Sequence, residues 1–247
     1  MHRKFKLPAR PKFTPVRGRP ALGSGWVHHV TQRGNNRQAV FYSDNERLVY
    51  LRLVGEYFPL YGLTLVGYNL MTNHSHLAVI PDLEDSLALG VGRMHNDYSR
   101  WHNVQHGRHG HLWQSRFFSC PVEEDRVWGV LGYIELNPVR AHMVEHAWDW
   151  EWSSARAHVT GVDPSGLLEM DFWRKHFDGA AWRDYLEKMA ADRSLTERIR
   201  KATARGRFFG SEVTARLLEV QLGREILPKK PGRKPKCSFQ PSKSGKE

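Results

Sequence analysis

Two histidines separated by a single residue, His74 and His76, begin an apolar run that ends at Pro81. Side chains of a β-strand alternate between its two faces, so both imidazoles would project to the same side. Two neighbouring imidazoles on a rigid strand can share one divalent ion. In a chain with 14 histidines, such a pair more often lies half-buried on a polar sheet face without a metal. A metal site therefore requires further ligands that converge on the pair.

A tyrosine and a histidine four residues apart, Tyr98 and His102, lie on the helix expected after this strand. Residues at that spacing share a helix face. If this face looks at His74 and His76, three imidazoles and a phenol meet at one place. Three such ligands with open positions suit Mg²⁺ or Mn²⁺ acting on a phosphate, and they also suit Zn²⁺. The alternative interpretation is that Tyr98 only packs and His102 lies at the surface.

A tyrosine at such a site would act as a nucleophile. A phenol has a pKa of about 10, so it must lose its proton on attack, and a nearby cation lowers the cost of that loss. The ion would polarise a phosphoryl oxygen and spread the charge that develops during displacement. The resulting phosphotyrosyl link would keep the energy of the phosphodiester for a later rejoining step.

Hydrophobic periodicity and turn residues predict the elements that must position these groups. A tight turn at Thr72–Asn73 joins the histidine strand to the strand before it. The predicted order is strand 26–31, strand 39–42, helix 43–61, strands 63–71 and 74–80, helix 85–104, strand 112–122 and helix 123–136, which Pro138 ends. This order predicts an α+β fold, a ferredoxin-like or RRM-like antiparallel sheet with packed helices.

Four regions of different composition divide the chain. Residues 1–23 predict a basic, proline-rich arm, and residues 24–160 hold the motifs of a candidate catalytic domain. Residues 161–227 predict a helical C-terminal extension that contacts DNA, and residues 228–247 predict a disordered basic tail. Further helices are expected at 151–154, where a short one closes the core, and at 180–191, 195–204 and 211–222.

The charge of the chain is strongly basic, with a formal net charge of +11 and a pI near 9.8. An excess of this size favours a polyanionic partner, with nucleic acid ahead of a membrane surface. Cys120 and Cys237 are far apart and no Cys-x-x-Cys occurs, so a thiolate zinc site is not expected. No apolar run approaches the ~20 residues that span a bilayer. A cytoplasmic, nucleoid-associated protein is therefore expected.

Several segments, read together and in order, resemble one family of enzymes. They are Val30–Arg37, Met71–Leu77, Tyr98–Asn103 with Leu112–Phe117, and Tyr133–Ala141, followed by Trp152–Ser154. The family is that of the single-tyrosine HUH transposases, and specifically the REP-associated tyrosine transposases, an insertion-sequence transposase-like group. The resemblance covers roughly residues 20–160, and segments 206–212 and 232–236 resemble the family's C-terminal extension with lower specificity.

This resemblance implies a metal-dependent endonuclease and strand transferase that acts on single-stranded DNA, with hairpin-forming palindromes as substrates. It implies His74 and His76 as ligands of Mg²⁺ or Mn²⁺. It also implies Tyr98 as the nucleophile that forms a 5′-phosphotyrosine link and frees a 3′-OH. The third ligand is expected one turn beyond the tyrosine, which by helix geometry is His102, with Asn103 as the competitor. No nucleotide cofactor is expected, because the transfer is near-isoenergetic.

DNA contacts are expected from the polar turn beside the sheet and from basic segments, although ordinary turn chemistry would explain several of the same residues. Trp113 and Phe117 mix aromatic rings with charge, as surfaces that stack bases often do, or belong to the core. Asn137–Pro138 is interpreted as a helix stop rather than as part of a site. The predicted DNA contacts are Gln32, Arg33, Asn35, Asn36, Arg37, Arg100, Arg116, Arg233 and Lys234.

Three other functions remain open from the sequence. A replication initiator or relaxase shares the histidine pair and the tyrosine, but a helicase domain would favour it and the chain has no Walker A motif. A DNA-binding regulator with an inactive site would use only the basic arms. A zinc-dependent hydrolase would use His74, His76 and His102. The sequence fits a monomer or a homodimer.

Overall fold

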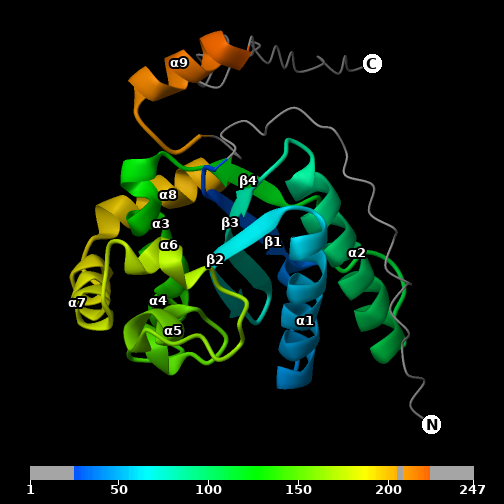
Figure 1. Ribbon diagram of the computed structural model, residues 1–247. Coiled ribbons are helices and arrows are strands. Elements are labelled where there is room, and N and C mark those ends of the chain that lie inside the picture. Colours follow the sequence, from blue (N-terminus) through cyan, green and yellow to red (C-terminus); the bar gives the residue numbers. More distant parts are fainter. Residues whose placement is uncertain (1–24, 205–207, 223–247) are drawn as a thin grey trace, which may run out of the picture.

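The computed structural model describes residues 25–204 and 208–222 (Figure 1). The expected arm, 1–23, and the expected tail, 228–247, which contains Arg233 and Lys234, lie outside the described residues. Within the described ranges, no helix combines the length and the apolar character needed to cross a membrane.

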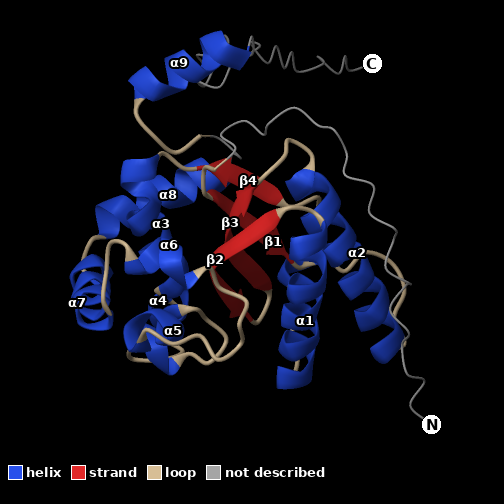
Figure 2. Ribbon diagram, viewed as in Figure 1, coloured by secondary structure: helices blue, strands red, loops and turns tan. Residues whose placement is uncertain are grey.

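A four-stranded antiparallel sheet lies at the centre of the described chain (Figure 2). Helix α1 (Asp44–Leu60) connects its first two strands, and α2 (Ser86–Gln105) connects its last two. The strands are β1 (His28–Arg33), β2 (Leu63–Met71), β3 (His74–Pro81) and β4 (Phe118–Pro121), in the order β2-β3-β1-β4. This β-α-β-β-α-β arrangement confirms the predicted α+β, ferredoxin-like fold.

The two faces of the sheet are covered by different helices (Figure 1). On one face lie α1 and α2, and there the hydroxyls of Tyr50 in α1 and Ser75 in β3 are hydrogen-bonded at 3.0 Å. On the other face lies α3 (Val127–Glu135), whose Tyr133 meets the ring of His76 edge-on. Because neighbouring strand residues point to opposite faces, Ser75 contacts the α1–α2 side and His76 contacts the α3 side.

The C-terminal half adds helices to the α3 face. Helix α8 (Arg193–Ala204) contacts α3, β1 and β4, and α7 (Gly179–Ala190) packs on α3 and α5. The helices expected at 180–191, 195–204 and 211–222 are confirmed, with ends shifted by one or two residues. The remaining helices are α4 (Asn137–Arg140), α5 (Ala155–Thr160), α6 (Met170–Arg174) and α9 (Glu212–Leu222), with short 3₁₀ turns η1 (Asn35–Arg37), η2 (Glu124–Arg126) and η3 (Ala147–Asp149).

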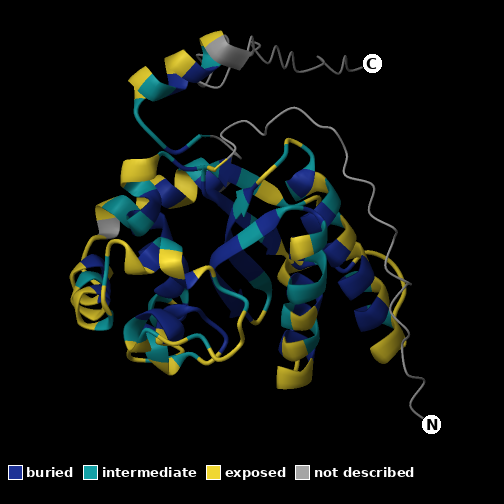
Figure 3. Cartoon of the chain, viewed as in Figure 1, coloured by how far each residue is buried: buried dark blue, intermediate teal, exposed yellow. Residues whose placement is uncertain are grey.

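Local sequence signals explain where the main elements begin. Ser43 and Glu46 form a capping box at the start of α1, in which each side chain accepts from the other residue's backbone N–H. The β2–β3 hairpin pairs Met71 with His74, as the expected two-residue turn requires. Figure 3 shows the result, with buried residues along the sheet and on the inner sides of the helices.

Two expected strands differ from the structure. Residues 39–42 form no strand, because the N–H groups of Val40 and Phe41 donate instead to the Thr72 carbonyl at the hairpin turn. The strand expected over 112–122 is regular only in β4, and its first part is an irregular loop held to the end of β1 by a hydrogen bond from Gln114 N–H to the Arg33 carbonyl. Single-strand periodicity does not reveal such competition for backbone partners.

Two expected helices also differ. The helix expected from residue 123 begins with η2 and becomes regular only at α3, which ends at Glu135 and is followed at once by α4 with Pro138 in its first turn. Residues 151–154 form turns, with an isolated bridge from Ser153 to Asn69, rather than a short helix, and α5 begins at Ala155. These shifts leave the order of the elements unchanged.

A buried histidine on α2 gives the fold an acid-sensitive position. His95 is buried on the α1–α2 side, with its Nε2 2.8 Å from the Tyr50 hydroxyl, and burial lowers the pKa of His95 to about 3. The unfolded chain, with an ordinary histidine pKa, binds the proton first as the pH falls below about 6.5. We therefore expect the contribution of His95 to stability to be complete above that pH and to fall by about 1.4 kcal/mol per pH unit between about 6.5 and 3. Urea unfolding of wild type and His95→Phe across this range should give a shallower pH dependence in the variant, and equal slopes would contradict the assignment.

Candidate functional site

The histidine pair lies on β3 as the alternation predicts. The rings of His74 and His76 meet edge-on with centroids 4.9 Å apart, on the face covered by α3. Nδ1 of His74 lies 2.6 Å from Oδ1 of Asn73, which can only accept, so His74 donates from Nδ1. Nδ1 of His76 lies 2.9 Å from Nε2 of His29. Both pair members therefore use Nδ1 for a neighbour and keep Nε2 as the nitrogen that can bind a metal.

A third imidazole, from His29 on β1, supports the pair. Its other nitrogen, Nδ1, lies 2.9 Å from the Thr203 hydroxyl on α8, so one chain of hydrogen bonds runs from α8 to His76. Burial, and then Arg140, lower the pKa of His29 to about 3. Burial, and then Arg33, lower the pKa of His74 to about 4. Neutral imidazoles at neutral pH are the form that metal binding requires.

A buried tyrosine from α3, Tyr133, completes this cluster. Its ring centroid lies 6.0 Å from that of His76 and 5.7 Å from that of His29, and 7% of the residue is exposed. Asn69, which pairs with His76 across the hairpin, donates to the Ile134 carbonyl at 2.9 Å and so fixes α3 against the sheet. Backbone and side-chain contacts together hold the phenol beside the histidines.

Arginines surround this phenol. The Arg140 guanidinium lies 4.3 Å from the ring centroid of Tyr133 and donates to its carbonyl at 2.5 Å. Burial raises the pKa of Tyr133, while Arg140, Arg200 and Arg33 act to lower it. The cluster therefore offers positive charge where a phosphate or a phenolate would need it.

An amide lies four residues after the tyrosine. Nδ2 of Asn137, at the start of α4, donates to the carbonyls of Tyr133 at 3.0 Å and Ile134 at 3.1 Å. Because the amide nitrogen makes both bonds, the amide oxygen is the atom that can serve as a ligand.

The structure does not bring Tyr98 and His102 to the histidine pair. Both lie on α2, which covers the opposite face of the sheet. Tyr98 is 0% exposed and donates its hydroxyl to the Val40 carbonyl at 2.6 Å. Burial, and then Glu46 and Tyr50, raise its pKa. Asn103, the competing third ligand, donates instead to the Gly110 carbonyl at 2.9 Å.

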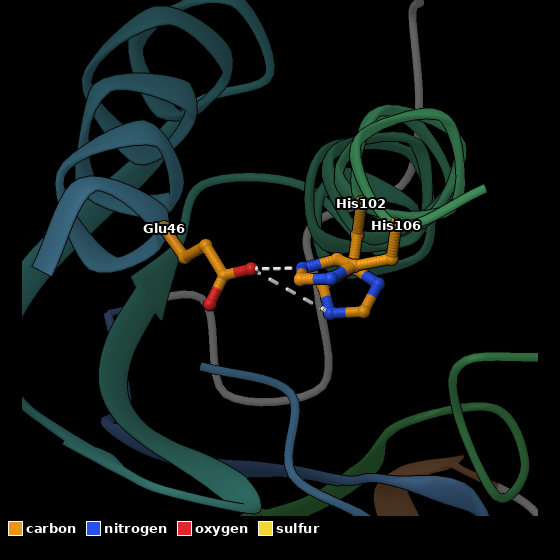
Figure 4. Close-up of side chains that lie close together, drawn as sticks. All are labelled: Glu46, His102 and His106. Carbon is orange, nitrogen blue, oxygen red and sulfur yellow. Dashed lines mark hydrogen bonds and ion pairs between the residues drawn. The ribbon is translucent and has the colours of Figure 1, made fainter. Parts of the chain in front are cut away.

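His102 joins a different group. It lies with His106 and Glu46, and ligand atoms of the three residues all lie within 4.8 Å of one another (Figure 4). Burial, and then His106, lower the pKa of His102 to about 4. This group fits a divalent metal ion.

A groove of about 1180 Å³ lies between α2 and the loop before β4. Trp113 and Phe117 line it and are half-buried. Their burial is intermediate between the two sequence interpretations, an exposed base-stacking surface and the core. Arg33, Asn36 and Arg37 lie outside the groove lining and are exposed near the end of β1. Of the predicted DNA contacts, the groove brings together Gln32, Asn35, Arg100 and Arg116.

Two of these groove residues bind other groups of the protein, and two predicted contacts outside the groove have unusual backbone angles. Gln32 donates to the Ser115 carbonyl at 3.0 Å, and Arg100 pairs with Asp97 on its own helix. Asn36 and Arg37 have positive φ angles of 49° and 59°, which an L-residue adopts only in a constrained turn. Gln32 and Arg100 therefore also serve the fold, whereas Arg116 is exposed at the groove edge.

Sequence reasoning did not place Tyr133, His29 and Arg140 beside the histidine pair, nor Asn137 beside Tyr133. The signal was present, since Tyr133 and Asn137 have the same spacing of four residues that drew attention to Tyr98 and His102. What the sequence lacked was the face of the sheet on which each helix packs.

Two sequence comparisons agree with the resemblance. Residues 24–137 match the family described as IS200-like transposases. A putative REP-associated tyrosine transposase of Haemophilus influenzae is 28% identical over 110 residues, which are 40% of this chain. That alignment spans 62% of the relative's length. A solved REP-associated tyrosine transposase bound to a REP hairpin aligns with a TM-score of 0.46 and 16% identity, covering 62% of this chain and 89% of that one.

Proposed function

We propose that this chain, whose residues 24–137 match the IS200-like transposase family, nicks and rejoins single-stranded DNA through a tyrosine and a divalent ion. The observation that carries the proposal is the cluster of His74, His76 and Tyr133 on one face of the sheet. Hairpin-forming palindromes are the proposed substrates, in keeping with the REP-associated relative. The basic net charge of +11 supports a DNA partner.

The proposed metal ligands are Nε2 of His74, Nε2 of His76 and the amide oxygen of Asn137. Two imidazoles and one amide oxygen leave positions open for phosphate oxygens, and Mg²⁺ or Mn²⁺ is the proposed ion. The ion would supply charge stabilisation at the scissile phosphate. The hydrogen bond from Nδ1 of His74 to Asn73 and the one between Nδ1 of His76 and His29 orient both imidazoles for this task.

Tyr133 is the proposed nucleophile in preference to Tyr98. Its phenolic oxygen would attack phosphorus and lose its proton, while the bond from phosphorus to the 3′-oxygen breaks and that oxygen takes up a proton. The 5′-phosphate is then linked to Tyr133, and the reverse attack by a 3′-OH restores a phosphodiester. Attack by Tyr98 would require α2 to leave the core, because its hydroxyl is buried against the Val40 carbonyl.

Several arginines and polar residues are proposed to hold the DNA. Arg33 and Arg140 lie close enough to the histidine pair to affect its pKa values, so either can meet a phosphate there. The α2 groove offers aromatic rings for unpaired bases. The remaining proposed contacts are Gln32, Asn35, Asn36, Arg37, Arg100, Arg116, Arg233 and Lys234.

The test is incubation of the full chain with a single-stranded hairpin oligonucleotide. With Mn²⁺ or Mg²⁺ we expect a covalent protein–DNA adduct on a denaturing gel, and with EDTA no adduct. Labelling each end of the oligonucleotide shows whether the 5′ side is retained on the protein. Tight binding without an adduct under either metal would reject the nuclease and leave a DNA-binding regulator.

The support that His29 gives to His76 can be tested by metal affinity. Removing a hydrogen-bond partner of a metal-binding histidine typically weakens metal affinity 10–100-fold. We therefore expect His29→Ala to bind Mn²⁺ about 10–100-fold more weakly than wild type in calorimetric titration. Thr203→Val, which removes only the outer hydrogen bond, should have a smaller effect. Unchanged affinity in His29→Ala would show that His76 needs no such support.

A further inference from the structure

A second cluster of possible metal ligands lies on the α1–α2 side of the sheet. Glu46 stands in the first turn of α1, and His102 and His106 stand in and just after the last turn of α2. Figure 4 shows the three side chains pointing toward one another from the two helices. The cluster is separate from the histidine pair, which lies on the opposite face.

The spacing suits one small ion. Residues four apart on a helix bring two imidazoles to one side, an arrangement known from helical zinc sites. Oε1 of Glu46 lies 2.5 Å from Nε2 of His106 and 3.9 Å from Nε2 of His102. Zinc binds histidine nitrogen and carboxylate oxygen at about 2.0–2.2 Å, which needs donor atoms roughly 3–3.5 Å apart. Small side-chain movements would bring all three atoms to that spacing.

The environment of His102 is the independent sign of a missing ligand. Its side chain is completely buried, and among the described residues neither ring nitrogen has a hydrogen-bond partner. Buried polar groups are almost always paired, because an unpaired one retains the cost of losing water. An ion shared with Glu46 and His106 would satisfy the nitrogen that faces them.

The carboxylate is held in place for this role. Oε2 of Glu46 accepts from the backbone N–H groups of Tyr42 and Ser43 in the helix cap. These bonds leave Oε1 directed at the two histidines. The side chain of His106 is 32% exposed, so water can reach the cluster.

We propose that Glu46, His102 and His106 bind Zn²⁺, with water in the fourth position. Two histidines and one glutamate are an established zinc ligand set, and two imidazoles favour zinc over Mg²⁺ or Ca²⁺. The ion joins the start of α1 to the end of α2 and stabilises the packing of these helices. The site stands on its own residues and does not depend on the proposed nuclease activity.

The experiment uses the full chain carrying His74→Ala and His76→Ala, so that zinc at the histidine pair does not contribute. After removal of metal with EDTA and dialysis, we expect one equivalent of Zn²⁺ to bind in calorimetric titration. Zinc in 100-fold excess over its dissociation constant should raise the Tm by about 5 °C or more. Co²⁺ should give the visible absorption of a tetrahedral complex.

Two further variants and a control decide the assignment. His106→Ala should lower zinc affinity at least about 100-fold and abolish the rise in Tm. Glu46→Gln keeps a side chain able to cap α1, so a loss of zinc binding there would not reflect a lost cap. His109→Ala removes an exposed histidine from the following loop and should bind zinc normally. No zinc binding by the parent, or equal binding in His106→Ala and His109→Ala, would overturn the proposal and leave an ordinary Glu46–His106 ion pair.

Discussion

Replacing Tyr133 by phenylalanine is expected to abolish the covalent adduct with a hairpin oligonucleotide. The phenolic oxygen is the only atom removed, so no bond to phosphorus can form, and strand cleavage should fall by about 10³-fold or more. The phenylalanine ring keeps its contacts with His29, His76 and the Arg140 guanidinium. Urea unfolding should therefore show a stability close to that of wild type, and DNA binding in a gel-shift assay should persist.

Tyr98→Phe is the matched control for this prediction. It should retain the adduct and lose about 1 kcal/mol of stability or somewhat more, because the Val40 carbonyl loses its hydrogen-bond donor. The reverse result, with an adduct in Tyr133→Phe and none in Tyr98→Phe, would assign the nucleophile to α2. It would also mean that α2 leaves the core during the reaction.

Replacing His76 by alanine is expected to have the second large effect. The variant loses one proposed ligand and the hydrogen bond to His29, so metal binding and adduct formation should both collapse. A metal ion at a phosphate is worth several kcal/mol, which corresponds to about 10³-fold in rate. Calorimetric titration with Mn²⁺ and the adduct assay measure the two losses separately.

Ser75→Ala is the control, because Ser75 directly precedes His76 on β3 but points to the other face of the sheet. It should lose only about 1 kcal/mol of stability through the missing hydrogen bond to Tyr50. Its adduct yield should equal that of wild type. Equal yields in His76→Ala and wild type would show that the reaction does not use the histidine pair.

The sequence allowed the sheet and its topology to be predicted because their signals are local. Period-two alternation identified the His74–Ile80 strand, and two polar residues between apolar runs identified the hairpin. The shared face of His74 and His76 followed from the same alternation and is present in the structure. Capping residues gave the start of α1 to within a residue.

The expected convergence of Tyr98 and His102 on the pair is absent from the structure, because helical periodicity defines a face but not its partner. In a β-α-β-β-α-β sheet, both connecting helices pack on one side. Alternate residues of β3 face that side, and Ser75 is one of them. His74 and His76 are on the alternate positions of β3 that face α3 instead. The position of Tyr133 depends on this long-range packing, which no single segment contains.

The hydrogen bond between His29 and Thr203 has a consequence for how such chains can be recombined. Thr203 lies about 130 residues after the histidine pair, yet its hydroxyl is two hydrogen bonds away from His76. Consider a hybrid that takes residues 24–160 from this chain and the remainder from a relative. In that hybrid, the residue that contacts His29 from α8 would come from the relative. We expect a mismatch between the two parts to change metal affinity, even where the choice of DNA is unchanged.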